Sequence, residues 1–141
     1  EYSHSIDAKG RLIMPAKLRE QLGNTFVITR GLDGCLFVYT DEEWKIKEEK
    51  FREIPLTKKE ARTFARFFFA GAAQLEIDKQ GRVLIPSTLR EHASLDKEVV
   101  LVGVLDRVEI WDKKRWEDTN TYSEDEMDEI AEKMAELGIG I

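Results

Sequence analysis

The sequence predicts an α+β, β-rich fold that is built from two tandem pseudo-repeats and carries additional packing helices. The first observation is that SIDAKGRLIMPAKLRE, at residues 5–20, returns as EIDKQGRVLIPSTLRE at residues 76–91. The second is that a strand–turn–strand segment, rich in β-branched and aromatic residues, follows each copy. The third is a set of capping-box patterns, which mark the starts of longer helices.

Each copy of the repeat opens with a predicted tight turn. Aspartate comes first and glycine fourth in both turns, at residues 7–10 and 78–81, which is the preference of a type I turn. A glycine in the left-handed conformation after such a turn closes a short hairpin with a bulge. The identities shared by the two copies are Ile6/Ile77, Asp7/Asp78, Gly10/Gly81, Arg11/Arg82, Pro15/Pro86, Leu18/Leu89, Arg19/Arg90 and Glu20/Glu91.

Short helices and strand pairs are predicted to follow the turns. Pro15 and Pro86 suit the first turn of a helix, so residues 16–22 and 87–93 are predicted to be helical. Residues 26–39 and 98–111 are predicted to form two strands each, with a Leu-Asp turn at the midpoint. The likeness between the copies therefore extends over about 40 residues each.

Three longer helices are predicted from capping boxes at residues 40–43, 57–60 and 123–126. The first runs to about Ile54 and stops before Pro55, and the second carries the Phe-rich segment and ends at Gly71. The third ends at Gly138 and places four apolar side chains on one face: Met127, Ile130, Met134 and Leu137. We divide the chain into a first repeat (1–46), a helical connector (47–71), a second repeat (72–117) and an acidic C-terminal helix (118–141).

Composition indicates a soluble globular protein of a reducing compartment. The chain is 42% hydrophobic and 35% charged, and it has no apolar run of the roughly 18 residues that a membrane span needs. No basic-then-apolar leader opens the chain, and its single cysteine, Cys35, excludes an internal disulfide. Because the chain starts at Glu1 without an initiator Met, we expect a few native residues to precede it.

The net charge of −6 is unevenly distributed along the chain. Residues 117–141 hold nine acids and one base, whereas residues 1–116 hold 21 bases and 19 acids. The acidity therefore belongs to the tail and the repeated body is mildly basic, which permits binding to nucleic acid.

The sequence contains few of the residues that an enzyme active site would need. The chain has only His4 and His92, no paired His or Cys–His spacing for a metal, and no Gly-rich loop for phosphates. Asp7 and Asp78 could share a proton as an acid-protease dyad does. Such a dyad needs a small residue after each aspartate, but only the first copy has one, Ala8, and the second copy has Lys79 there. We therefore predict no catalytic residue, metal, cofactor or small-molecule substrate.

Two interpretations of the repeated Asp-x-x-Gly-Arg remain. In the first, Asp7 and Asp78 accept turn N–H groups and pair with Arg11 and Arg82, which only braces the turns. In the second, the turns belong to a basic β-ribbon that binds DNA, because a two-stranded ribbon fits the major groove and an arginine there grips a guanine edge with two bonds. A bracing role does not explain why lysines also occupy these turns.

The doubled Asp-x-x-Gly-Arg-x-x-x-Pro pattern resembles the MraZ family of bacterial regulators, whose chains carry two swapped-hairpin units of the SpoVT/AbrB type. The resemblance implies a double-split β-barrel of the AbrB-like swapped-hairpin kind, and ring-like homo-oligomers that are cytoplasmic and nucleoid-associated. It also implies binding to short direct repeats in double-stranded DNA, upstream of the cell-division and cell-wall gene cluster that contains the family member's own gene.

Carried over residue by residue, the family's Asp-x-x-x-Arg falls on Asp7 and Arg11 and on Asp78 and Arg82. We predict that the arginines contact bases or backbone, that Lys9 and Lys79 contact phosphate, and that the aspartates, with Gly10 and Gly81, structure the turns. We expect the longer helices, the Phe-rich one included, to pack the barrel or join subunits. The alternatives are a ring-forming interaction scaffold and an antitoxin-like module that masks a partner enzyme.

Overall fold

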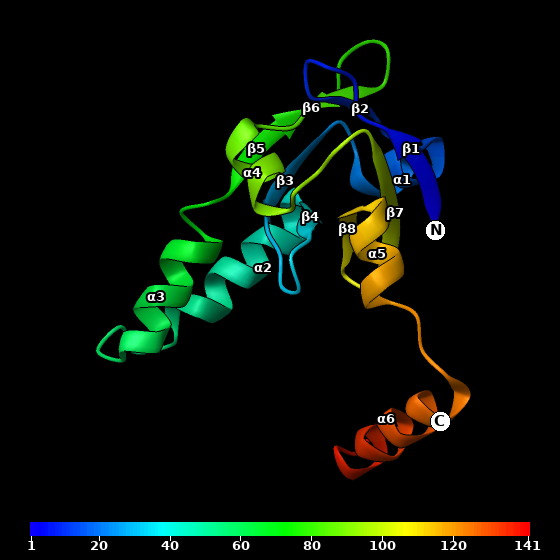
Figure 1. Cartoon of the computed structure of the whole chain (residues 1–141). Coiled ribbons are helices and arrows are strands. Elements are labelled where there is room, and N and C mark those ends of the chain that lie inside the picture. Colours follow the sequence, from blue (N-terminus) through cyan, green and yellow to red (C-terminus); the bar gives the residue numbers. More distant parts are fainter.

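The computed structural model describes residues 1–141 as an α+β fold with two antiparallel sheets (Figure 1). The strands are β1 (Tyr2–Ser5), β2 (Arg11–Ile13), β3 (Thr25–Arg30), β4 (Leu36–Thr40), β5 (Ala73–Glu76), β6 (Arg82–Leu84), β7 (Glu98–Val104) and β8 (Arg107–Asp112). The helices are α1 (Ala16–Leu22), α2 (Asp41–Arg52), α3 (Lys59–Phe68), α4 (Ser87–His92), α5 (Lys113–Thr119) and α6 (Glu124–Glu136). The predicted fold class and the tandem repeat are confirmed.

The two repeats exchange strands. The large sheet has the order β1-β7-β8-β4-β3-β5, so the first strand of each repeat lies beside the third strand of the other repeat. The small sheet pairs β2 with β6, again one strand from each repeat. The predicted turns are therefore confirmed, but the strands on either side of each turn do not pair as a hairpin. The isolated bridge between Ile6 and Leu12 closes the first turn, and β1 and β2 belong to different sheets.

An approximate twofold axis relates the repeats, because both sheets read the same from either edge once β1–β4 are matched with β5–β8. The central pair of the small sheet is Leu12 with Val83, and the pair in register at the centre of the large sheet is Phe37 with Glu109. Each pair joins equivalent positions of the two copies, so the axis passes between them.

The main core lies between the two sheets and the short helices, and both repeats fill it with the same positions. Leu12, Met14, Leu18 and Leu22 from one copy meet Val83, Ile85, Leu89 and Ala93 from the other, all buried. Because neither repeat can cover these side chains alone, each half depends on the other for its core.

A second, aromatic cluster lies on the outer side of the large sheet, mostly over the first repeat, and includes Val100 and Trp111 of the second. Tyr39 and Phe68 are buried there, with ring centroids 6.0 Å apart, and Trp44 of α2 packs on both. The Phe-rich α3 thus packs against α2 and β3. The expectation that α2 and α3 pack the sheet is met, although Phe64 stays 37% exposed.

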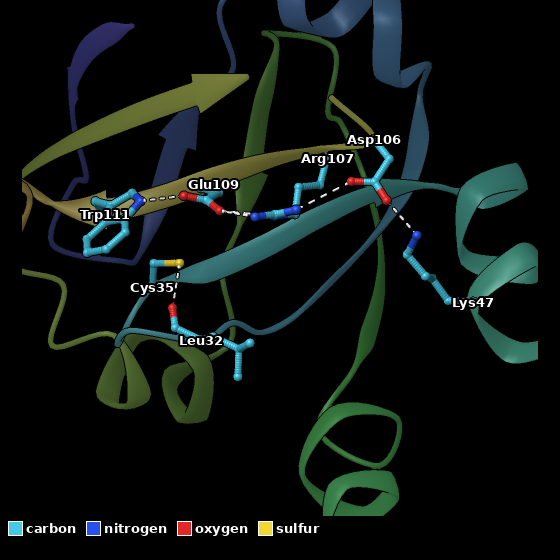
Figure 2. Close-up of polar contacts among 7 residues, drawn as sticks. All are labelled: Leu32, Cys35, Lys47, Asp106, Arg107, Glu109 and Trp111. Atoms are coloured by element: carbon cyan, nitrogen blue, oxygen red, sulfur yellow. Dashed lines mark hydrogen bonds and ion pairs between the residues drawn. The ribbon is translucent and has the colours of Figure 1, made fainter. Parts of the chain in front are cut away.

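A chain of polar contacts crosses the outer face of the second repeat (Figure 2). Glu109, which is nearly buried, accepts hydrogen bonds from Trp111 Nε1 at 3.0 Å and Arg107 Nε at 2.9 Å. Arg107 also contacts Asp106, which accepts a hydrogen bond from Lys47 of α2. The buried carboxylate is thus paired, as its desolvation requires, and the network ties the β7–β8 turn to α2.

Cys35 is buried beside this network, and its thiol donates to the carbonyl of Leu32 at 3.2 Å (Figure 2). Burial, together with the nearby Glu109 carboxylate, raises the pKa of the thiol to about 12. A thiol that stays protonated at neutral pH is a poor nucleophile, so Cys35 is a packing residue.

Most predicted helices are confirmed, with corrections at several of their ends and one omission. Helices α2 and α6 are capped by Thr40 and Ser123, whose side chains accept hydrogen bonds from the backbone N–H three residues on, as predicted. The capping box at residues 57–60 is wrong, because α3 begins one residue later, with Lys58 at its N-cap and no side-chain cap. Three helices end earlier than predicted: α2 at Arg52 instead of about Ile54, α3 at Phe68 instead of Gly71, and α6 at Glu136 instead of Gly138. Helix α5, capped by Asp112, was not predicted.

Helix α6 makes no extensive contact with any other helix or strand of the chain. It has no buried residue and lies apart from the sheets and from α3 (Figure 1). Of the two roles predicted for this helix, packing the barrel is not seen for α6, and a role between subunits stays a prediction. None of the helices combines the length and apolar character that crossing a membrane requires.

Candidate nucleic-acid interface

The Asp7 carboxylate organises the first turn. Its Oδ1 accepts the backbone N–H groups of Lys9 at 3.0 Å and Arg11 at 2.9 Å, and its Oδ2 accepts Arg11 Nε at 2.7 Å. Gly10 N–H donates to the Asp7 carbonyl at 3.0 Å, and Gly10 has a φ of 88°, a left-handed conformation that favours glycine. The turn therefore has the hydrogen bonds and the glycine conformation that its sequence predicts.

The second turn repeats this arrangement. Asp78 Oδ1 accepts the backbone N–H groups of Gln80 and Arg82, each at 2.9 Å, and its Oδ2 accepts Arg82 Nε at 2.9 Å. In both turns the arginine uses only Nε within the chain, so both terminal Nη groups remain free to bind a ligand. The aspartate thus holds the arginine in place while leaving its outer fork available.

The hydrogen bonds lower the pKa of both aspartates. The backbone N–H of Arg11 has the largest effect on Asp7 and that of Arg82 on Asp78, opposed by partial desolvation and reinforced by the guanidinium groups. A dyad sharing one proton would instead raise the pKa of one carboxyl group. Each carboxylate is engaged by its own turn, so the acid-protease alternative has no support.

These lowered pKa values predict an acid-sensitive structure. The stability that each aspartate contributes is present above its unfolded pKa, near 3.8, and is lost as the pH falls through the lower folded pKa. We expect the unfolding free energy of an Asp7→Asn/Asp78→Asn variant to fall less steeply than that of the wild type as the pH drops below about 4. Urea titrations between pH 2 and 6 measure this difference, and parallel curves for the two proteins would contradict it.

The outer face of the small sheet carries both arginines. Leu12 and Val83 point into the core, so the neighbouring residues point outward in the cross-strand pairs Arg11–Leu84 and Ile13–Arg82. Ile13 is 52% and Leu84 56% exposed. Two residues along the strands and one strand spacing separate the arginine Cα atoms, roughly 8 Å. This face, Arg11, Ile13, Arg82 and Leu84, is called the ribbon face below.

The turns stand on either side of the ribbon face at the same end of the molecule, the top of Figure 1. Lys9 and Lys79, the predicted phosphate contacts, are both exposed and have no ion-pair partner in the chain. They do not occupy equivalent positions, because Gln80 stands where the first turn has Lys9. The two turns therefore present their lysines differently.

Two further arginines lie at the turns, and sequence reasoning gave them no role. A Cβ added to Gly10 would lie 2.7 Å from Arg90 Cζ, and one added to Gly81 would lie 2.6 Å from an Nη atom of Arg19. Arg19 on α1 and Arg90 on α4 thus each cover the turn of the other repeat. Both recur in the repeated sequence, which was the available signal. With them, each turn holds three bases and one acid.

No group of three or more His, Cys, Asp or Glu side chains in the chain is arranged to hold a metal ion. His92 instead contacts the carbonyl of Gly31 at 3.3 Å and packs against Phe67. The chemistry of the ribbon face is that of a binding surface, with guanidinium forks and aliphatic side chains presented together.

Comparison with known proteins identifies the family of the chain. The family model described as "MraZ protein, putative antitoxin-like" matches the chain twice, at residues 1–67 and 68–137. The chain belongs to the MraZ family. It is 58% identical to the transcriptional regulator MraZ of Ligilactobacillus salivarius (strain UCC118) and to that of Thermoanaerobacter sp. (strain X514), in each case over 139 residues, 99% of this chain and 97% of the relative. The MraZ of Acetivibrio thermocellus is 58% identical over 142 residues, with the same coverage.

Membership in MraZ confirms the family that the doubled motif indicated. It also agrees with the prediction that the chain is not an enzyme, since these MraZ relatives are named as transcriptional regulators. The two matches to the MraZ model divide the chain near the end of α3, so that the first match includes α2 and most of α3 and the second begins at residue 68.

Proposed function

We propose that the chain is a sequence-specific, DNA-binding transcriptional regulator whose ribbon face and flanking turns contact double-stranded DNA. The observation that carries this proposal is the pair of pre-oriented guanidinium groups, each held through Nε by an aspartate while its Nη groups are free. An arginine fixed in this way loses little entropy when it binds two acceptors on a guanine edge or a phosphate. Ile13 and Leu84 between them suit contact with thymine methyl groups.

The finer features of the family belong to the same proposal. The interleaved sheets support a double-split β-barrel of the swapped-hairpin type, and we propose the domain limits 1–46, 47–71, 72–117 and 118–141. We further propose ring-like homo-oligomers, a cytoplasmic and nucleoid-associated location, and binding to short direct promoter repeats of the division and cell-wall gene cluster that includes the chain's own gene. Several weak sites in one oligomer would bind repeated DNA tightly through effective concentration.

The experiment that tests this function compares two duplexes of equal length and composition, the promoter DNA upstream of the chain's own gene and a shuffled version. We expect at least about a thousandfold preference for the promoter at physiological salt, the lower end for specific regulators. Fluorescence anisotropy with competitor DNA measures the ratio. Equal binding to both duplexes, or no binding, would favour the scaffold alternative instead.

The lysines of the turns are expected to act through charge alone. Replacing Lys9 and Lys79 by glutamine should weaken binding to promoter and shuffled DNA by similar factors. It should also make the slope of log K against log salt less negative by about 0.9 for each phosphate that the variant no longer neutralises. A change in the preference between the two duplexes, with the salt slope unchanged, would show that the lysines read bases.

A further inference from the structure

Helix α6 presents an apolar face that the chain leaves uncovered. Met127, Ile130 and Leu137 are 43%, 39% and 73% exposed, and Met134 completes the same face at helical spacing. The face extends over ten residues, about 15 Å of helix. Every other longer helix in the chain rests on a sheet or on another helix. A face of this kind is typical of a helix that is buried in an assembly.

An apolar groove of about 270 Å³ lies between α2 and α3 at the other side of the molecule. Phe37, Tyr39 and Phe68 form its buried floor, and Phe51 and Phe64, with ring centroids 5.7 Å apart, form its wall. The exposed Leu32 and Ile54 also line it. Its charged lining residues are Lys50, which makes no ion pair in the chain, and Lys47, which is paired with Asp106.

The helix and the groove are complementary in charge as well as in polarity. Residues 117–141 hold nine acids and one base. By helical spacing, Glu124 and Glu126 flank the apolar face of α6, and its other acids lie on the opposite side. An amphipathic acidic helix that enters the groove would bury its methionine and isoleucine side chains on the aromatic floor and bring its two flanking carboxylates towards Lys50. Helix-in-groove contacts of this type use anchors at the same spacing.

We propose that α6 of one copy docks in the groove between α2 and α3 of a second copy. Within one chain, α6 follows α5, which packs on β7 and β8, whereas α2 packs on β3 and β4. The connecting residues 120–123 span at most about 14 Å, and α6 stands apart from α3 (Figure 1). A helix of another copy meets no such restriction.

This contact rests on the proposed self-association and specifies how it occurs. Each copy offers one helix and one groove, on different parts of its surface, so the contact is heterologous. A repeated heterologous contact closes into a ring when the rotation between copies permits, and otherwise continues as a filament. The DNA-binding turns take no part in it.

The test uses two full-length variants that each damage one side of the contact. The helix variant is Ile130→Gln/Met134→Gln, which keeps good helix formers, and the groove variant is Leu32→Glu/Ile54→Glu, which places acids at the mouth of the groove. All but the partly buried Met134 are exposed side chains, so folding should be retained. The matched control is Leu105→Glu, an exposed leucine at the corresponding turn of the second repeat.

Sedimentation velocity without DNA measures the assembly against the 16.3 kDa of one chain. We expect the wild type and the control to self-associate, and each variant alone to do so at least about 30-fold more weakly, the loss typical of a disrupted hot spot. An equimolar mixture should form a pair, because the intact α6 of the groove variant fits the intact groove of the helix variant. A monomeric wild type, unchanged assembly of either variant, or no association in the mixture would overturn the proposal. Promoter binding, measured separately, tests the proposed function.

Discussion

An Arg11→Ala/Arg82→Ala variant is expected to lose most of its affinity for promoter DNA while keeping its fold. Each arginine that grips a base edge contributes about 1–3 kcal/mol, so the double variant should bind at least about 30-fold more weakly. The turns should survive, because each aspartate keeps two backbone N–H donors when the guanidinium is removed. Anisotropy titrations at several salt concentrations measure the loss.

The matched control is Arg66→Ala, which removes the same side chain from an exposed position on α3 that makes no ion pair in the chain. A second variant, Arg11→Lys/Arg82→Lys, separates charge from geometry: it should bind shuffled DNA nearly as well as the wild type does, yet prefer the promoter less. If the alanine double variant binds the promoter as tightly as the Arg66 control, the arginines are turn braces only.

The second large effect is expected in stability, from Leu12→Ala. Leu12 is fully buried opposite Val83 at the centre of the small sheet, where the two repeats meet. Truncating a buried leucine to alanine costs about 2–5 kcal/mol, because transfer free energy is lost and a cavity remains. We expect urea unfolding, at one fixed protein concentration, to show a loss in this range.

Ile13→Ala provides the comparison on the same strand. Ile13 is the next residue but faces outward, so its truncation should change stability by only about 0.5 kcal/mol. It should instead weaken promoter binding if the aliphatic side chains of the ribbon face contact DNA. Equal destabilisation by the two substitutions would mean that the small sheet is not the seam between the repeats.

The elements that follow local rules could be predicted from the sequence. The turns at Asp7 and Asp78 have their aspartate and glycine at fixed places, and both were located correctly because the required hydrogen bonds are formed within five residues. Thr40 and Ser123 cap their helices for the same reason. At Thr57 the same pattern gave a wrong prediction. A capping box shows that a side chain can cap a helix, not that the helix starts there, and α3 begins one residue later.

Contacts between the two repeats could not be predicted from local sequence patterns. The pairing of β2 with β6, and the placement of Arg90 on Gly10, join residues some 70 or more positions apart. Only the family resemblance suggested swapped hairpins. Helix α5 was not predicted, because it is short and its N-cap residue, Asp112, is also the last residue of β8. The free face of α6 could not be anticipated either, since an amphipathic helix usually finds its partner within the chain.

The pair in register on the approximate axis, Phe37 with Glu109, has an evolutionary consequence. In a dimer of two identical short chains this position would face its own copy, giving two phenylalanines or two nearly buried carboxylates side by side. Joining two gene copies in one reading frame removes that restriction, so the halves can diverge independently: one has become aromatic around Phe37, the other charged around Arg107 and Glu109. The lysines of the two turns, Lys9 and Lys79, stand at positions that are not equivalent, which is a second place where the two halves have diverged.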